Sequence, residues 1–443
     1  MKIKWIDDWR GVRFGPALVF LITTFSVVAW AGFNPVWSQT QPQQDWEIRD
    51  GKFYSNGEWV FLKVAKPLRN FADAGAVDRL ISELAVLQAK DYNTIEINCY
   101  WHHFDRDGDG VPDVSLEPLN RLIDAIYERG MMPCLSVETY SVGGGQMPPG
   151  LWTRFPDADA INEAGNTVTD TEYGFGSRVV SIFHEGYRAA ARTFIKQLTA
   201  GIDHQKILYF ETTVEPQYMG VINLCYSAHA RQAYAAWRQA NGKEGIAPDM
   251  PATFPIDQSF VENEDWNVFR AQFLADWVNG DAAAFREVAG EDAYIAVDYL
   301  DAEENSMKKR LGNPEAFLAH LTAPNIIQVN WTWFFPSNSP NQKAYDRVRE
   351  ASKTYGRDWA ITEHMTFNGS DFSHYSEDEL RQILLNTLMQ DTRFGWEFVS
   401  VGASTAGSFS LYNDDWTPKP VIAVVDRHWD EWMAKVRAIE DGN

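Results

Sequence analysis

The sequence predicts an α/β protein built as one (β/α)₈ barrel of the TIM-barrel type, after a short N-terminal hairpin. Short apolar runs of strand length alternate with longer segments whose apolar residues repeat at helical spacing. This alternation yields eight candidate strands, which favours a closed parallel barrel. A length of 443 residues is enough for one such barrel with long loops. A doubly wound open sheet is the alternative arrangement of the same elements.

The first half of the chain opens with the hairpin. Residues 48–63 contain the turn Ser55-Asn56-Gly57 and lead into an apolar run over 59–65, which is the first predicted strand. A helix is predicted over 76–90, because apolar residues there recur at intervals of three and four. The same reasoning predicts further strands over 93–99, 131–137 and 206–210, and further helices over 116–129 and 186–200.

The second half continues the alternation of strands and helices. Helices are predicted within 227–288 and over 314–321, 342–354, 377–389 and 421–439. The remaining strands are predicted over 293–299, 326–331 and 359–362, and the last one somewhere within 398–412.

Composition and charge exclude one class of partner and favour another. The net charge is −22, and no basic run interrupts the acidic surplus, so nucleic acid is not expected as a ligand. Aromatic residues make up 14% of the chain. Such an excess suits a cleft that stacks on the apolar faces of sugar rings, and plain core packing is the alternative explanation.

The N-terminus has the pattern of a targeting segment. Four basic residues among the first thirteen precede an uncharged stretch over 16–31, which ends in the small-x-small sequence Ala29-Trp30-Ala31. Residues 1–31 are therefore predicted to be a signal peptide, 32–45 a polar connector and 46–443 the barrel domain. The expected location is secreted or periplasmic. A membrane anchor is the alternative if the segment stays uncleaved.

Two glutamates follow predicted strands four and seven. Strand 206–210 runs into Glu211 and then Glu215, and strand 359–362 runs into Glu363. In a parallel barrel, residues at the carboxyl ends of the strands face the catalytic mouth. Glycoside hydrolysis needs one protonated carboxyl and one ionised carboxylate at such a mouth. A helix cap or an ion pair is the ordinary role of either residue alone.

The motifs around these glutamates resemble those of the clan A glycoside hydrolases. The run from Tyr209 to Pro216 resembles the strand-four signature, in which an Asn-Glu-Pro carries the acid/base, and Thr362-Glu363 resembles the strand-seven nucleophile. Asn93-Thr94-Ile95 and Tyr100-Trp101 are similar to families 5, 35 and 42, and Phe269-Arg270 is similar to family 42, in a range from cellulases and mannanases to β-galactosidases. The resemblance implies a retaining hydrolase of β-linked sugars, with Glu215 as acid/base and Glu363 as nucleophile. It implies no organic cofactor.

The chain departs from the clan pattern at two positions. Val214 stands where the clan usually has an Asn that binds the sugar 2-hydroxyl. Glu96 stands where an Arg often supports the nucleophile. These departures keep a second hypothesis open, a carbohydrate-binding barrel that does not cleave its ligand.

Other residues at strand ends are candidates for contacts to the sugar, and core packing is the alternative role for the aromatic ones. They follow strands two, three, five, six and seven of the predicted barrel. The set comprises Trp101, His102, His103, Glu138, Tyr140, Asp298, Tyr299, Trp331, Trp333 and His364.

An acidic loop after strand two is a candidate calcium site. Asp105, Asp107, Asp109 and Asp113 occur at alternate or nearly alternate positions, and Gly110 allows a tight turn. Residue 116, where a calcium loop has a bidentate Glu, is Leu. The alternatives are a structural calcium ion and a solvated acidic turn.

Overall fold

The computed structural model describes residues 46–442 apart from 171–175, 221, 301–303, 331–341, 357–359, 366–374, 391–392 and 403–409. At 141–142, 304–306, 330 and 360–365 it describes the backbone alone. The predicted signal peptide and connector lie outside these ranges. By length and apolar character, the described helices all fall short of what a bilayer crossing requires.

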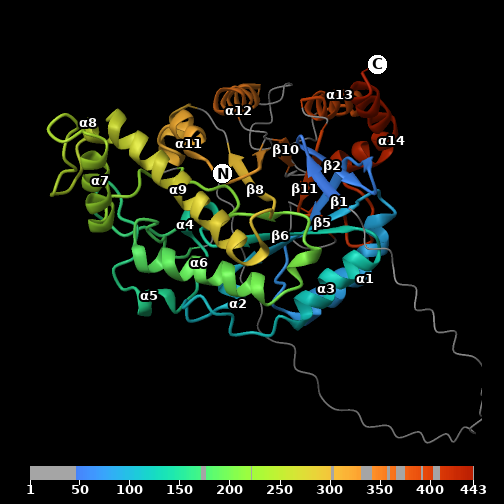
Figure 1. Ribbon diagram of the computed structural model, residues 1–443, viewed down its shortest axis with the longest axis horizontal. Helices are drawn as coiled ribbons and strands as arrows, with labels where there is room; N and C mark the ends of the chain where they lie inside the picture. Colours follow the sequence, from blue (N-terminus) through green and yellow to red (C-terminus); the bar gives the residue numbers. More distant parts are fainter. Residues whose placement is uncertain are drawn as a thin grey trace, which may run out of the picture.

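Eight parallel strands close into a barrel, which confirms the predicted fold and excludes the open sheet (Figure 1). Each strand pairs with its neighbours in chain order, and the eighth strand pairs with the first. The strands are β4 (Leu62–Lys66), β5 (Thr94–Tyr100), β6 (Met132–Glu138), β7 (Phe210–Glu211), β8 (Ile295–Leu300), β9 (Ile326–Asn330), β10 (Ala360–Met365) and β11 (Gly395–Val399).

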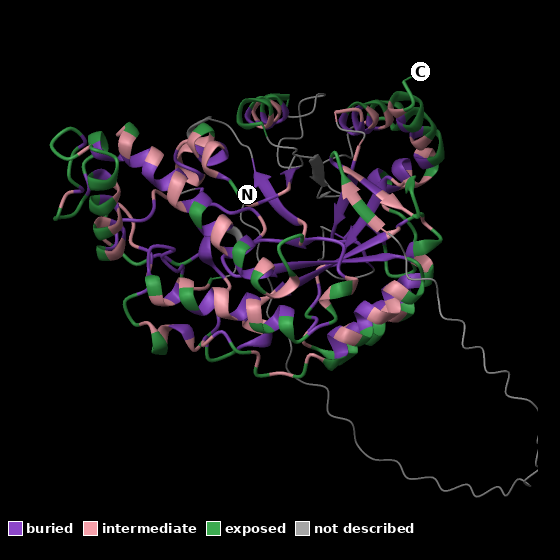
Figure 2. Cartoon of the chain, viewed as in Figure 1, coloured by how far each residue is buried: buried purple, intermediate pink, exposed green. Residues whose placement is uncertain are grey.

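Helices surround the barrel and bury its outer face. The long ones are α1 (Ala74–Gln88), α3 (Glu117–Glu128), α6 (Glu185–Ala200), α7 (Ala228–Ala240), α9 (Glu264–Ala289), α12 (Gln342–Tyr355), α13 (Glu377–Leu388) and α14 (Pro420–Glu440). Shorter helices are α2 (Trp101–Phe104), α4 (Ser141–Gly144), α5 (Leu151–Arg154), α8 (Gln258–Val261), α10 (Glu304–Arg310) and α11 (Pro314–His320), together with the 3₁₀ turn His204–Lys206. Figure 2 shows the buried strands in the centre and exposed residues on the outer helix faces.

Side-chain caps fix where several helices begin. Asp73 accepts a hydrogen bond from the Gly75 amide at the start of α1, and Ser227 accepts one from the Ala230 amide at the start of α7. Ser376 and Glu379 form a reciprocal capping box on α13. Each cap satisfies an amide that the first helical turn leaves without a partner.

The barrel interior is apolar at its amino-terminal end. A small cluster there includes Leu62, Val64, Cys134 and Ile326. Phe53 belongs to the same cluster and comes from the hairpin β1 (Trp46–Arg49) and β2 (Lys52–Ser55), which a short strand β3 (Glu58–Trp59) extends. The hairpin therefore closes the bottom of the barrel, and it is tied to α14 by the Lys52–Glu440 ion pair.

Several predicted bounds need correction. The eighth strand is 395–399 and overlaps only the start of the predicted 398–412 window. The prediction missed its first residues because Glu397, which is buried in the barrel interior, interrupts the apolar run in the sequence. The fourth strand has only two residues, and Lys206, the first residue of its predicted range 206–210, is the last residue of a 3₁₀ turn. Of the six short helices only α11 was individually predicted, over 314–321, since segments of four to seven residues carry little periodic signal.

The pairing of the last strand with the first predicts a sensitive position at Gly395. A Cβ there would lie 2.6 Å from Leu62 Cβ and 2.7 Å from Leu62 O. We expect Gly395→Ala to lower the free energy of unfolding by about 1–3 kcal/mol through overpacking. Gly75→Ala is the control, because its new Cβ would meet Asp73 at an ordinary 3.5 Å. Urea titration of both variants measures the difference, and equal stabilities would contradict the prediction.

Candidate active site

Toward the carboxyl ends of the strands the barrel interior is charged, and Lys66 lies at the centre of the charged groups. The Lys66 ammonium is 2.5 Å from Glu96 Oε1, 2.9 Å from Glu211 Oε1 and 3.5 Å from Glu397 Oε1. All four side chains are at most 1% exposed. The oxygens of the three carboxylates lie close enough together to hold a metal ion, but Lys66 already supplies the cation among them.

Hydrogen bonds from side chains on or next to other barrel strands hold the carboxylates around Lys66. Tyr209 Oη donates to Glu96 Oε2 at 2.9 Å, and Gln328 Nε2 donates to Glu397 Oε2 at 3.0 Å. Ser136 Oγ lies 3.1 Å from Glu211 Oε1 and 3.3 Å from Glu138 Oε1. Since the Ser136 hydroxyl has a single proton, both contacts are hydrogen bonds only when one of these two carboxyls is protonated.

Burial and the surplus of negative charge around Lys66 favour the protonated forms of Glu96 and Glu211. Burial, and then the neighbouring Glu397, raise the pKa of Glu96 to about 8, although Lys66 opposes the shift. Burial and Glu96 raise the pKa of Glu211 well above its usual range. Burial alone would lower the pKa of Lys66, but the surrounding carboxylates outweigh it and raise the pKa instead. Lys66 therefore stays charged, while Glu96 and Glu211 hold their protons to higher pH than free carboxyls do.

Glu215 lies just beyond β7, at the carboxyl end of the barrel as the sequence predicts. It is 5% exposed, and its backbone φ is 47°, in the left-handed region. Gln217 Nε2 donates to Glu215 Oε2 at 2.8 Å, and Arg310 in turn donates to Gln217 Oε1. The sequence analysis did not identify Gln217 or Arg310, because neither belongs to a recognisable motif.

Asp298 on β8 is a buried carboxyl whose pKa is affected by Glu215. It is fully buried, and burial followed by the charge of Glu215 raises its pKa well above the usual range. Asp298 and Glu215 thus interact at the ends of neighbouring barrel strands. The sequence analysis proposed Asp298 as a sugar contact, and its position beside Glu215 is compatible with that role.

Glu363 lies within β10, where its backbone pairs in register with Val329 of β9 and Trp396 of β11. Val329 and Trp396, which are in register with Glu363, pack toward the helices. Glu397, which is in register with His364, contacts Lys66 inside the barrel. The side chains of Glu363 and His364, and all of Trp331 and Trp333, lie outside what the structure describes. Their predicted roles stay predictions.

Three of the proposed sugar contacts are core residues instead. Trp101 is fully buried and stacks on Tyr187 at 6.0 Å, and Tyr140 packs against Trp277 at 5.8 Å. Tyr299 stacks on Phe317 of α11 at 6.2 Å, on the helix side of the sheet. Core packing, the alternative stated for the aromatic residues, is therefore the role of these three.

His102 and His103 lie on the single turn α2, directly after β5. Both are partly exposed, and their rings are 4.2 Å apart. Burial lowers the pKa of both, that of His103 to about 4, so both are neutral at neutral pH. They remain candidates for hydrogen bonds to a ligand.

The acidic loop brings three of the four proposed calcium ligands together. Oxygens of Asp105, Asp107 and Asp109 lie within 4.8 Å of one another, whereas Asp113 accepts a hydrogen bond from the Arg106 amide. Buried Asp105 also accepts bonds from the Gly108 and Gly110 amides and from the Trp101 indole. The guanidinium of Arg154 lies 3.7 Å from Asp107 and from Asp109, so it competes with any cation. Calcium binding stays a prediction.

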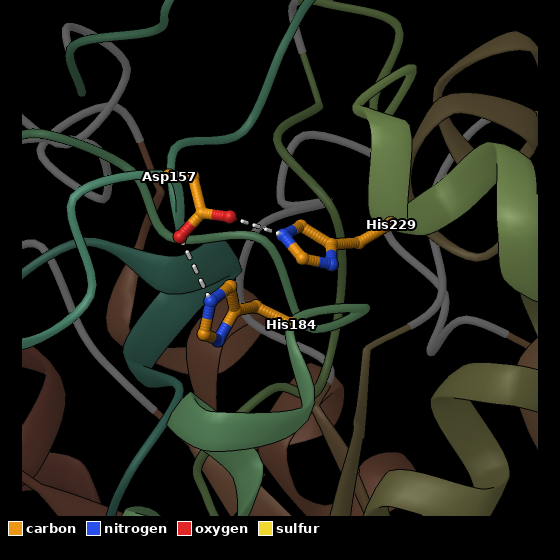
Figure 3. Close-up of side chains that lie close together, drawn as sticks. All are labelled: Asp157, His184 and His229. Carbon is orange, nitrogen blue, oxygen red and sulfur yellow. Dashed lines mark hydrogen bonds and ion pairs between the residues drawn. The ribbon is translucent and has the colours of Figure 1, made fainter.

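A second cluster of potential ligands lies at the N-terminal ends of α6 and α7 (Figure 3). Asp157 accepts from His184 Nε2 at 3.2 Å and from His229 Nε2 at 3.0 Å. His184 Nδ1 accepts the Tyr187 amide at 3.0 Å and so caps α6. A neutral imidazole with an accepting Nδ1 carries its proton on Nε2, which then cannot bind a metal. The geometry therefore makes Asp157, His184 and His229 a hydrogen-bonded cluster rather than a metal centre, and we call these three residues the clasp.

The comparisons with known proteins identify the fold. No protein-family model and no curated protein matches the chain. The structure is similar to the catalytic domain of β-amylase from Paenibacillus polymyxa, with a TM-score of 0.61 and 13% identity over 85% of this chain and 98% of that one. β-Galactosidase from the psychrophilic Marinomonas ef1 gives a TM-score of 0.58 and 13% identity over 86% and 60% of the two chains.

A catalytic mutant of a GH42 β-galactosidase from G. stearothermophilus gives a TM-score of 0.59 and 14% identity over 85% of this chain and 57% of that one. The chain thus spans somewhat over half the length of these two β-galactosidases, and nearly all of the β-amylase domain. These likenesses confirm the (β/α)₈ barrel fold that the sequence predicts.

The raised pKa of Glu96 predicts a loss of stability toward alkaline pH. The unfolded chain releases this proton near pH 4.5, while the folded protein holds it to about pH 8. Glu96 therefore stabilises the fold fully below pH 4.5, and this contribution is lost as the pH rises through about 8. We expect Glu96→Gln to flatten the fall in unfolding free energy between pH 5 and pH 8.5, measured by urea titration. Glu128→Gln, on the exposed face of α3, is the control, and a slope unchanged in Glu96→Gln would contradict the prediction.

The clasp predicts the opposite pH dependence at His184. Burial, and then His229, lower the pKa of His184, so the folded state favours its neutral form. Its contribution to stability is present above the unfolded pKa of about 6.5 and is lost as the pH falls through the lower folded value. We expect His184→Asn, which keeps a capping acceptor without a titrating ring, to lose less stability than the wild type between pH 7 and pH 5. Urea titrations at both pH values test this, and an equal or greater loss in the variant would refute it.

Proposed function

We propose that this chain is a glycoside hydrolase that cleaves β-linked glycosides or polysaccharides with retention of configuration. The observation that carries the proposal is the place of Glu215. This buried carboxyl lies at the end of the fourth barrel strand, beside a second carboxyl, Asp298, on the fifth. Paired carboxyls at the carboxyl end of a parallel barrel suit acid/base chemistry on a glycosidic bond.

In the proposed reaction Glu215 protonates the leaving oxygen, while Glu363 attacks the anomeric carbon to form a glycosyl intermediate. Water then attacks this intermediate, and Glu215 acts as base. The hydrogen bond from Gln217 orients the carboxyl group of Glu215. Glu363 is assigned as the nucleophile from the Thr362-Glu363 motif. Asp298 is the alternative nucleophile to test, because it lies beside Glu215.

The second hypothesis is a barrel that binds carbohydrate without cleaving it. Val214 and Glu96 motivate this hypothesis, because the usual Asn and Arg are missing there. However, the network has a cation of its own, since Lys66 enters from the first strand and pairs with Glu96. The electrostatic support that the Arg would give therefore has a replacement, which favours the hydrolase.

Variants of the three carboxyls test the proposal. We expect the wild type to hydrolyse some member of a panel of aryl β-glycosides and β-glucan, mannan and galactan polymers. Glu215→Ala and Glu363→Ala should each lose on the order of 10²-fold or more in kcat. Added azide should give a β-azide product with Glu215→Ala and an α-azide product with Glu363→Ala.

Asp298→Asn and the exposed Glu128→Ala are the comparison variants. An α-azide product from an Asp298 variant, with Glu363→Ala active, would move the nucleophile to Asp298. Glu128→Ala should match the wild type. Sugar binding without turnover on every substrate would refute the hydrolase and support the binding barrel.

A further inference from the structure

We propose that Glu138 is a positioning residue that fixes the backbone on which Glu215 is presented. The inference rests on the proposed function, because it assigns to Glu138 a part in the same reaction. The sequence analysis placed Glu138 among the sugar contacts. In the structure its carboxylate oxygens contact protein groups on neighbouring segments.

Protein groups occupy both oxygens of Glu138. Oε1 lies 3.2 Å from Asn98 Nδ2 and 3.3 Å from Ser136 Oγ. Oε2 accepts hydrogen bonds from Thr213 Oγ1 at 3.2 Å and from the Val214 amide at 3.1 Å. A carboxylate offers about four lone-pair sites, and the side chain is 1% exposed, so no site remains for a sugar hydroxyl.

The Val214 amide directly precedes Glu215, so the bond to Glu138 fixes the backbone at the catalytic residue. Glu215 has φ 47°, a conformation that a residue with a side chain keeps only where its surroundings impose it. Glu138 restrains this backbone on one side, and the Gln217 contact restrains the side chain on the other. Thr213 extends the restraint, because its hydroxyl also accepts the Tyr140 amide at 3.1 Å.

Lys66 allows Glu138 to serve this purpose while buried. Burial raises the pKa of Glu138, but the Lys66 charge and the bonds from Val214 and Thr213 oppose the rise. Two of the four contacts, from the Asn98 amide and the Val214 amide, come from groups that can only donate. A charged acceptor makes stronger bonds to such donors than a neutral one. The Val214 backbone is thus anchored, through Glu138, to the charged centre of the barrel.

The test is Glu138→Gln, compared on two aryl or alkyl glycosides of the same sugar. A substrate with a poor leaving group needs the proton from Glu215, whereas a dinitrophenyl glycoside does not. We expect kcat/KM for the poor leaving group, which reports formation of the glycosyl intermediate, to fall on the order of 10²-fold, and kcat/KM for the dinitrophenyl glycoside to change less than about fivefold. For the dinitrophenyl glycoside kcat and KM should fall together, because Glu215 is also the base in hydrolysis of the intermediate.

Two further variants separate positioning from general damage. Glu83→Gln is the matched control, because Glu83 is a buried carboxylate that pairs with Arg69 and Arg79 away from this site. It should leave both substrates near wild-type rates. Thr213→Val removes one bond to Glu138 and should show the same leaving-group selectivity, to a smaller degree. Equal losses on both substrates in Glu138→Gln, or no loss on either, would overturn the proposal.

Amide hydrogen exchange at Val214 gives a readout that does not depend on hydrolysis. In the wild type this amide should be protected, and in Glu138→Gln it should exchange at least tenfold faster, with Glu83→Gln unchanged. Unchanged protection in Glu138→Gln would overturn the positioning role. Failure of the wild type to hydrolyse any substrate would overturn the proposed function alone, since the exchange result would still stand.

Discussion

The site depends on one ammonium group held inside the barrel. Lys66 meets three carboxylates from three other strands, and burial would make each of them unfavourable as an unpaired charge. Removing the cation would leave acids in a space closed to water. The raised pKa of Glu96 and of Glu211 follows from the same imbalance, because one positive charge cannot neutralise three carboxylates.

The two ends of the barrel interior differ in polarity and in what they contribute to the protein. At the amino-terminal end the hairpin residue Phe53 closes an apolar plug, which supplies burial without any polar requirement. At the carboxyl end the described interior includes the carboxyls of Glu96, Glu138, Glu211 and Glu397, and hydrogen bonds across strands hold these four. The plug stabilises the fold, while the polar layer orients the segment after β7 that carries Glu215.

The loops on one side of the mouth are tied to each other at both ends. Near the barrel, the Tyr140 amide donates to Thr213, and the Cβ of any residue replacing Gly143 would meet Met219 at 3.1 Å. Farther out, the clasp of Asp157 and His229 joins the same two segments. The acid/base segment is therefore supported along its length rather than at a single contact.

The sequence by itself determined the fold class, most of the strands and helices and the position of Glu215, because hydrophobic periodicity and a strand-end motif are local signals. It could not place the eighth strand, where Glu397 interrupts the apolar run. Nor could it single out Lys66, which looks like an ordinary charge at the end of a strand. Only the pairing of parallel strands decided that Lys66 meets Glu96 and that Glu138 accepts from Val214, since these partners are far apart in the chain. Closure of the barrel then brought Glu397 of the last strand to Lys66 of the first.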